Sequence, residues 1–172
     1  MQDDLIIKTT DLTKSYGPHV ALSKLNLSVP KGATGLLGPN GAGKSTFLKT
    51  ILGLVQTTEG EGTVLGLDIR TQGDEIRSRI GYMPEYDSLN PDMEAIHQVR
   101  YSGELLGMNP TIALARAHET LQYVGLGEQR YRNIGSYSTG MKQATKLACA
   151  LIHDPELLSL IHISEPTRLG FI

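Results

Sequence analysis

Short apolar stretches, one of them alternating regularly with polar residues, mark the first half of the chain as strand-rich. Residues 25–29 (LNLSV) alternate apolar and polar side chains, which is typical of a strand with one buried face. Similar short segments predict strands at residues 5–9, 33–37, 62–66 and 80–83, and the beginning of a further strand at residues 156–158. We expect residues 57–60 to form a loop and Pro84 to end the strand before it.

The spacing of apolar residues becomes helical in the second half. It predicts helices at residues 92–106 and 110–124, and a third helix that begins after Ser138 and runs to about residue 153. Pro110 suits the first position of a helix, and Gly125 suits the position just past the end. Strands, then a mostly helical block, then a return to strand predict an α/β fold with a helical insertion.

A glycine-rich segment between the strand at residues 33–37 and a short predicted helix carries the most specific chemistry. It reads Gly38-Pro39-Asn40-Gly41-Ala42-Gly43-Lys44-Ser45-Thr46 and matches the phosphate-binding pattern Gly-four residues-Gly-Lys-Ser/Thr. The glycines let consecutive N–H groups turn toward phosphate oxygens, and Lys44 adds a positive charge. Ser45, with Thr46 behind it, offers a hydroxyl to Mg²⁺. The segment therefore predicts nucleotide binding at a helix N-terminus; the alternative is a glycine turn beside an exposed lysine.

The composition of the chain mainly excludes other classes of protein. The chain has 172 residues, is 40% hydrophobic and has a formal net charge of −2, which suits one domain. Because no basic run stands out, nucleic acid is not expected as a partner. Cys149 is the single cysteine, so no disulfide framework is possible. The sequence shows no signal peptide and no apolar run of membrane-spanning length, so a cytoplasmic location is expected, with any membrane link made through a partner.

Taken in order, residues 5–157 resemble the ATP-binding subunit of an ABC transporter. The resemblance implies an α/β P-loop NTPase core of the ABC ATPase type, with an N-terminal antiparallel β part and a helical subdomain. It implies ATP and Mg²⁺ as cofactors. It divides the chain into a β-rich P-loop core at residues 1–86, a helical subdomain at 87–135, and the signature helix with the start of the Walker B strand at 136–157.

The segment at residues 12–17 (LTKSYG) resembles the family's aromatic loop. This implies that Tyr16 stacks on adenine, and base–aromatic stacking contributes roughly 1–3 kcal/mol in nucleic-acid binders. The alternative is a tyrosine packed at the end of a strand.

The segment at residues 81–85 (GYMPE) lies where the family has its Q-loop, whose glutamine touches Mg²⁺ and the attacking water. Glu85 stands in the place of that glutamine. A carboxylate is a good ligand for a hard metal, although it cannot donate a hydrogen bond when ionised. Glu85 is therefore a candidate Mg²⁺ ligand, and the alternative is a surface loop residue.

The segment at residues 137–143 (YSTGMKQ) resembles the family signature Leu-Ser-Gly-Gly-Gln, with Ser138 and Gly140 retained. The resemblance implies that Ser138 caps the following helix and binds a γ-phosphate held by a second nucleotide-binding domain. It therefore implies a dimer with composite sites. The alternative is an ordinary helix cap.

Past Leu157 the resemblance ends. The family has a strand ending in Asp-Glu-Pro-Thr, whose Asp holds Mg²⁺ and whose Glu polarises the attacking water. Here Ser164 stands where the Asp should be. One interpretation is a degenerate native strand with Glu165 as the base. We favour another, because residues 158–168 match one reading frame of a transposase-type sequencing adapter: residues 158–172 are expected to be a non-native tail, and the C-terminal part of the family's fold is missing.

Phosphoryl transfer depends mostly on positioning and electrostatics. Since the family's Walker B Asp, catalytic Glu and switch His are missing, we expect ATP binding with poor hydrolysis, and only Glu85 remains as a candidate near the chemistry.

The function implied by the resemblance is to couple ATP binding and hydrolysis to transport through a membrane permease, on which the helical block at residues 87–135 would dock. The subunit would then sit on the inner face of the cell membrane. Two alternatives stay open: a soluble ATP-dependent switch protein for translation or repair, and a non-functional fragment.

Overall fold

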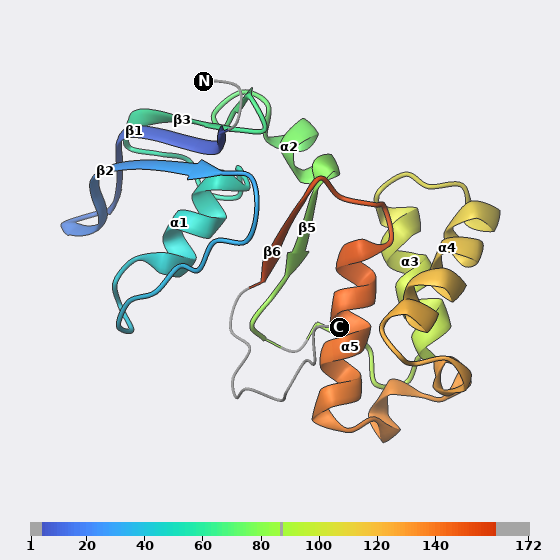
Figure 1. Cartoon of the computed structure of the whole chain (residues 1–172). Coiled ribbons are helices and arrows are strands. Elements are labelled where there is room, and N and C mark those ends of the chain that lie inside the picture. Colours follow the sequence, from blue (N-terminus) through green and yellow to red (C-terminus); the bar gives the residue numbers. More distant parts are fainter. Residues whose placement is uncertain (1–4, 87, 161–172) are drawn as a thin grey trace. The chain divides into compact units, whose positions relative to one another are not determined.

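The computed structural model describes residues 5–86 and 88–160 (Figure 1). The described residues fall into two compact units, the first ending at Ser78 and the second beginning at Arg79. Each unit is described by itself. Of the helices in these described ranges, none is long and apolar enough to cross a membrane.

An antiparallel sheet forms the first unit, with the strand order β2-β1-β3-β4. Its strands are β1 (Leu5–Tyr16), β2 (His19–Pro30), β3 (Glu59–Val64) and β4 (Leu67–Asp68). The strands predicted at residues 5–9 and 25–29 are confirmed, and both extend further than predicted. Leu12 and Val64 are fully buried on the covered face of this sheet.

The strand predicted at residues 62–66 is displaced, and the loop predicted at residues 57–60 is partly wrong. β3 begins at Glu59 and ends at Val64. A Cβ added to Gly60 would collide with the backbone carbonyl of Asp11 on β1, and Gly60 has φ +79°. The glycine that indicated a loop is therefore the residue that lets β3 approach β1 at an irregularity in the ladder.

The strand predicted at residues 33–37 is wrong for the structure as described. Within residues 5–86, no strand pairs with this segment, and its residues are exposed, Leu37 by 93%. Apolar composition can indicate a strand, but a strand also needs a hydrogen-bonding neighbour, which composition does not supply.

Helix α1 (Lys44–Ile51) follows the glycine-rich segment as predicted. It buries Phe47 and Ile51, and Gly53, with φ +65°, lies just past its end. Helix α2 (Gly73–Arg79) was not predicted, because its only buried residue is Ile76 and a single apolar position shows no period.

The second unit combines a two-stranded parallel sheet with three helices (Figure 1). The strands are β5 (Ile80–Met83) and β6 (Leu157–Leu160), and β5 ends directly before Pro84 as predicted. The helices are α3 (Ala95–Leu105), α4 (Pro110–Tyr123) and α5 (Thr139–Leu151), and two short 3-10 turns, η1 (Glu128–Tyr131) and η2 (Ile134–Ser136), precede α5. All three predicted helices are confirmed, although α3 begins later than predicted.

The residues that flank α4 explain where this helix begins and ends. The Asn109 side chain accepts a hydrogen bond from Thr111 N (2.9 Å) ahead of Pro110, and Gly125, with φ +80°, follows α4. The helices share one core cluster, and its buried members are Ala95, Ile96, Val99, Ala117, Leu121, Leu126, Ile134, Tyr137, Ala148 and Ile152.

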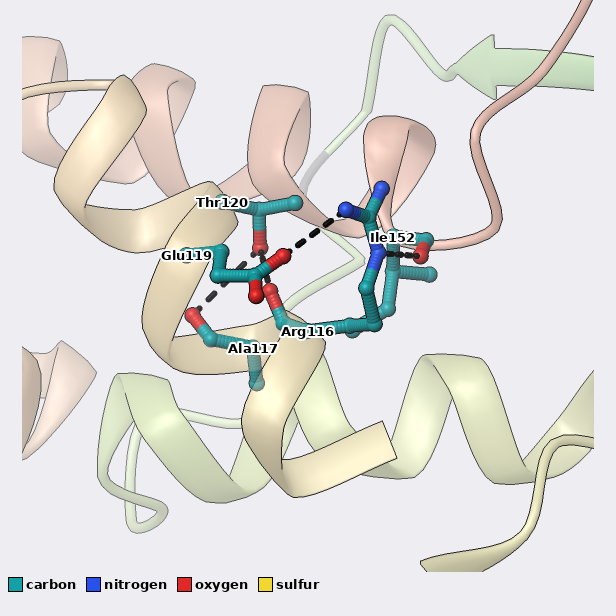
Figure 2. Close-up of polar contacts among 5 residues, drawn as sticks. All are labelled: Arg116, Ala117, Glu119, Thr120 and Ile152. Atoms are coloured by element: carbon teal, nitrogen blue, oxygen red, sulfur yellow. Dashed lines mark hydrogen bonds and ion pairs between the residues drawn. The ribbon is translucent and has the colours of Figure 1, made fainter. Parts of the chain in front are cut away.

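An arginine ties α4 to the C-terminal end of α5. Arg116 Nε donates to the Ile152 carbonyl at 3.3 Å, and Arg116 Nη1 lies 2.8 Å from the carboxylate of Glu119 on the same helix (Figure 2). The ion pair orients the guanidinium, and the carbonyl belongs to the residue that caps α5. A cation at this end also opposes the negative pole of the helix.

Candidate functional site

The glycine-rich segment lies between β2 and α1 in the first unit. Gly41 and Gly43 have φ +84° and +85°, the left-handed conformation that glycine adopts without strain. Gly43 is the N-cap of α1, and in this described helix no side chain caps the first turn and no acidic residue lies in it. The first N–H groups of α1 have no carbonyl partner within the helix. They are therefore available to an anion.

Gly43 also holds the segment against β2. A Cβ at this position would lie 2.5 Å from the Ala21 carbonyl oxygen and 2.9 Å from Leu22 Cδ2. Both the conformation and the space thus require glycine. This contact places the start of α1 against the first residues of β2.

The Lys44 ammonium bends back over the segment. Nζ donates to the carbonyls of Gly38 (2.6 Å) and Pro39 (2.8 Å). The groups gathered here are backbone N–H, an ammonium and the hydroxyls of Ser45 and Thr46, all of them able to donate hydrogen bonds. This donor set fits the phosphates of a nucleotide, and the Ser45 hydroxyl can join Mg²⁺ that those phosphates bring.

Tyr16 ends β1 in the same unit. It pairs with His19 at the start of β2, two residues before the Ala21 carbonyl that contacts Gly43. The ring is 48% exposed, and Lys14 Nζ lies over it, 4.8 Å from its centroid. The ring therefore lies at the end of a strand, as the alternative interpretation has it, and about half of its surface is left accessible for stacking.

Ser138 and Gly140 lie at the start of α5 in the second unit, and both are exposed. Ser138 Oγ accepts a hydrogen bond from Met141 N at 3.3 Å, which makes it the N-cap of α5 as predicted. A Cβ on Gly140 would meet no heavy atom of the described residues within 4 Å beyond its chain neighbours and the nearby backbone of its own helix. The start of this helix is thus open to a ligand.

Tyr137 replaces the family's leucine directly before Ser138. Its side chain is buried, and its hydroxyl donates to the Gln129 carbonyl at 2.5 Å. Burial raises the pKa of Tyr137, with a smaller opposing effect from Arg132, so the hydroxyl stays a donor at neutral pH. The substitution keeps an apolar anchor and adds a hydrogen bond that holds the segment before α5.

Glu85 is exposed and follows Pro84 at the carboxyl end of β5. It belongs to the second unit with Ser138, whereas Lys44 and Tyr16 belong to the first. Candidate site residues therefore occur in both units: Tyr16 and the glycine-rich segment in the first, and Glu85, Ser138 and Gly140 in the second. In the described ranges, no group of three or more His, Cys, Asp or Glu side chains could hold a metal ion. A metal here would depend on nucleotide phosphates for most of its ligands.

Cys149 is partly buried, and burial raises the pKa of its thiol to about 11, so the thiol stays protonated at neutral pH. Lys146, four residues after Lys142 on α5, was missed: it is only 4% exposed, and its ammonium contacts the backbone on either side of Glu85. In the sequence, Lys146 is marked only by its place directly before the apolar run at residues 147–152.

Comparison with known proteins gives one family. Residues 22–166 match the family model described as ABC transporter. The chain is 38% identical over 164 residues to the bacitracin transport ATP-binding protein BcrA of Bacillus licheniformis, covering 95% of this chain and 52% of BcrA. It is 36% identical over 167 residues to the Nod factor export ATP-binding protein I of Sinorhizobium fredii (strain NBRC 101917 / NGR234), covering 96% of this chain and 48% of that protein. The chain thus spans about half the length of these relatives.

The solved structures that resemble this chain belong to the same kind of protein as these relatives. One described as the ATP binding subunit of an ABC transporter has a TM-score of 0.75 at 26% identity and covers 89% of this chain and 64% of that one. The ADP conformation of MJ1267, an ATP-binding cassette of an ABC transporter, has a TM-score of 0.77 at 24% identity, with 90% and 67% covered, which shows the fold alone. The predicted α/β fold of the ABC ATPase type is confirmed.

Proposed function

Because the chain belongs to the ABC transporter family, we propose that it binds MgATP as the nucleotide-binding part of a transport ATPase that works with a membrane permease. The observation that carries the proposal is the donor set at the start of α1. There a left-handed Gly43, a helix whose first described turn is free of acidic residues, and the Lys44 ammonium face the same loop. Such a set attracts a polyphosphate and repels no part of it.

The remaining site residues extend this proposal. We infer that Tyr16 stacks on the adenine, because its ring is half exposed on the strand that pairs with the part of β2 touching Gly43. Mg²⁺ would be held by the Ser45 hydroxyl and the phosphates, with Glu85 as a further ligand. Ser138 and Gly140 would contact the γ-phosphate on a second nucleotide-binding domain, so the active assembly would contain two such domains.

Transport is the favoured setting. The relatives above are named for bacitracin transport and Nod factor export. We propose that the helices α3 and α4 dock on a permease, which would place the chain on the inner face of the cell membrane.

Binding of MgATP tests the proposal directly. Isothermal titration of the chain with MgATP is expected to show one site, and Lys44→Ala is expected to weaken binding at least about tenfold, since a hydrogen bond to a charged group contributes about 1.5–3 kcal/mol. Lys8→Ala is the control, because Lys8 is exposed on β1 and lies outside the glycine-rich segment. Equal affinity of the Lys44 variant and the wild-type chain would contradict the proposal.

A further inference from the structure

We propose that Lys146 is a positioning residue whose ammonium fastens the loop carrying Glu85 to the helix that presents Ser138. The inference rests on the proposed function, because it gives these two candidate site residues a shared mechanical support. It concerns a side chain that lies outside every sequence motif described above.

The contact is direct and sheltered from water. Lys146 is 4% exposed, and its Nζ donates to the Tyr86 carbonyl at 2.7 Å. The Pro84 carbonyl lies 3.5 Å from the same nitrogen, at the limit of a hydrogen bond. These two carbonyls flank Glu85 in the chain. The ammonium therefore holds the backbone on both sides of that carboxylate.

Burying an ammonium is costly, since a charge leaves water and must be satisfied by hydrogen bonds. Lysine is among the residues least often fully buried for this reason. An apolar side chain of the same length could fill the position between Thr145 and Leu147 without this cost. Such a side chain could not donate hydrogen bonds to the two carbonyls. The hydrogen bonds to the loop are therefore what lysine adds at this position.

The far end of the loop is fastened to the same structural unit. Asn90 N donates to the side-chain oxygen of Gln98 on α3 at 3.0 Å, and Gly135 N, just before the signature segment, donates to the Pro91 carbonyl at 2.8 Å. Lys146 supplies the tie at the near end. With both ends held, Glu85 and Ser138 move as parts of one body.

Removing the ammonium should free only the near end of the loop. We would measure amide hydrogen exchange by mass spectrometry on the full chain for Lys146→Met, which keeps the length and apolar stem, and for Lys146→Arg, which keeps the charge and donors. Lys8→Met controls for loss of a positive charge at an exposed site. Exchange in the peptide spanning residues 85–90 is expected to rise at least about tenfold in Lys146→Met, corresponding to about 1.4 kcal/mol of local stability. The arginine variant should restore most of the protection, while α3 and α4 stay unchanged.

Two results would overturn the inference: unchanged exchange at residues 85–90, or an equal rise across the whole second unit with no rescue by arginine. The wild-type chain offers a second test that needs no variant. A hydrogen-bonded, buried ammonium should give a slowly exchanging ¹H–¹⁵N signal for Lys146 at neutral pH, and rapid exchange of that ammonium would also overturn it. Neither measurement involves nucleotide. Failure of MgATP binding would therefore contradict the proposed function while leaving the role of Lys146 to be decided by these data.

Discussion

Gly81 shows how closely one residue can control the packing of the second unit. A Cβ at this position would collide with the Ala150 carbonyl on α5 and would lie 2.9 Å from Leu158 Cδ1 and 3.0 Å from Pro155 Cγ. Backbone atoms cannot move aside as a flexible side chain can. The absence of a side chain therefore allows β5 to lie directly against α5.

Gly81→Ala is accordingly expected to destabilise the chain by about 1–3 kcal/mol, the usual range for overpacking a filled core. Urea unfolding followed by circular dichroism would measure the change. Gly140→Ala provides the control, since its Cβ would meet no described atom within 4 Å and alanine favours the helix. Equal midpoints for the two variants would show that β5 and α5 separate easily.

Whether a residue's role could be predicted depends on how far along the sequence its hydrogen-bond partner lies. Ser138 could be assigned as a helix cap because its partner, Met141 N, lies three residues away. Lys146 could not be assigned a partner, since the Tyr86 carbonyl is 60 residues away in the sequence. No local pattern records a contact of that length. The exposure of Tyr16 likewise depends on how two strands pair.

At the level of helices and strands, the second unit followed the sequence more closely than the first. Helices α4 and α5 have regular apolar spacing and marked ends, so propensity, period and caps all agreed. The segment at residues 33–37 has apolar composition without a paired neighbour, and α2 has a single buried side chain. When a helix or strand is stabilised by residues distant in the sequence, or by very few contacts, its own sequence shows little periodic pattern from which to predict it.

The contact between α4 and α5 should be measurable as a stability term. Arg116→Met keeps an apolar stem but loses the donor to the Ile152 carbonyl, so we expect a loss of about 1 kcal/mol from the hydrogen bond and the helix-end charge together. Thermal unfolding would report it as a lower Tm. Glu119→Gln is the matched control: it weakens the ion pair but leaves the carbonyl contact, and it should cost less. A larger loss in the Gln variant would assign the effect to the surface ion pair instead.

For the whole molecule, binding and hydrolysis are expected to separate. The candidate binding residues lie at two helix starts, at the end of β1 (Tyr16) and after β5 (Glu85). None of them replaces the family's metal-holding Asp, where Ser164 stands outside the described residues. We therefore expect MgATP binding with turnover at least about 10²-fold below that of a relative with an intact Walker B strand, because positioning and charge supply most of the catalysis in phosphoryl transfer. A phosphate-release assay on both proteins at saturating MgATP would measure it. Turnover equal to that of the relative would contradict this expectation.

The origin of residues 158–172 bears on the same question and stays a prediction. The first residues of this segment complete β6, where Ser159 and Leu160 pair with Tyr82 and Met83. Sequencing the source DNA across the codon for Leu157 would decide it. A native Asp-Glu-Pro-Thr continuation would support a non-native tail, and a DNA read encoding the printed residues would refute it.

Helix α5 can also be considered as a lever. Its 13 residues span about 20 Å at 1.5 Å per residue, with Ser138 at one end and the carbonyl held by Arg116 at the other. A tilt of roughly 5° about the held end would displace Ser138 by about 1.7 Å, enough to break a hydrogen bond to a ligand. A rotation of α5 about that end would therefore displace Ser138 further than any residue within the helix, in proportion to the length of the helix.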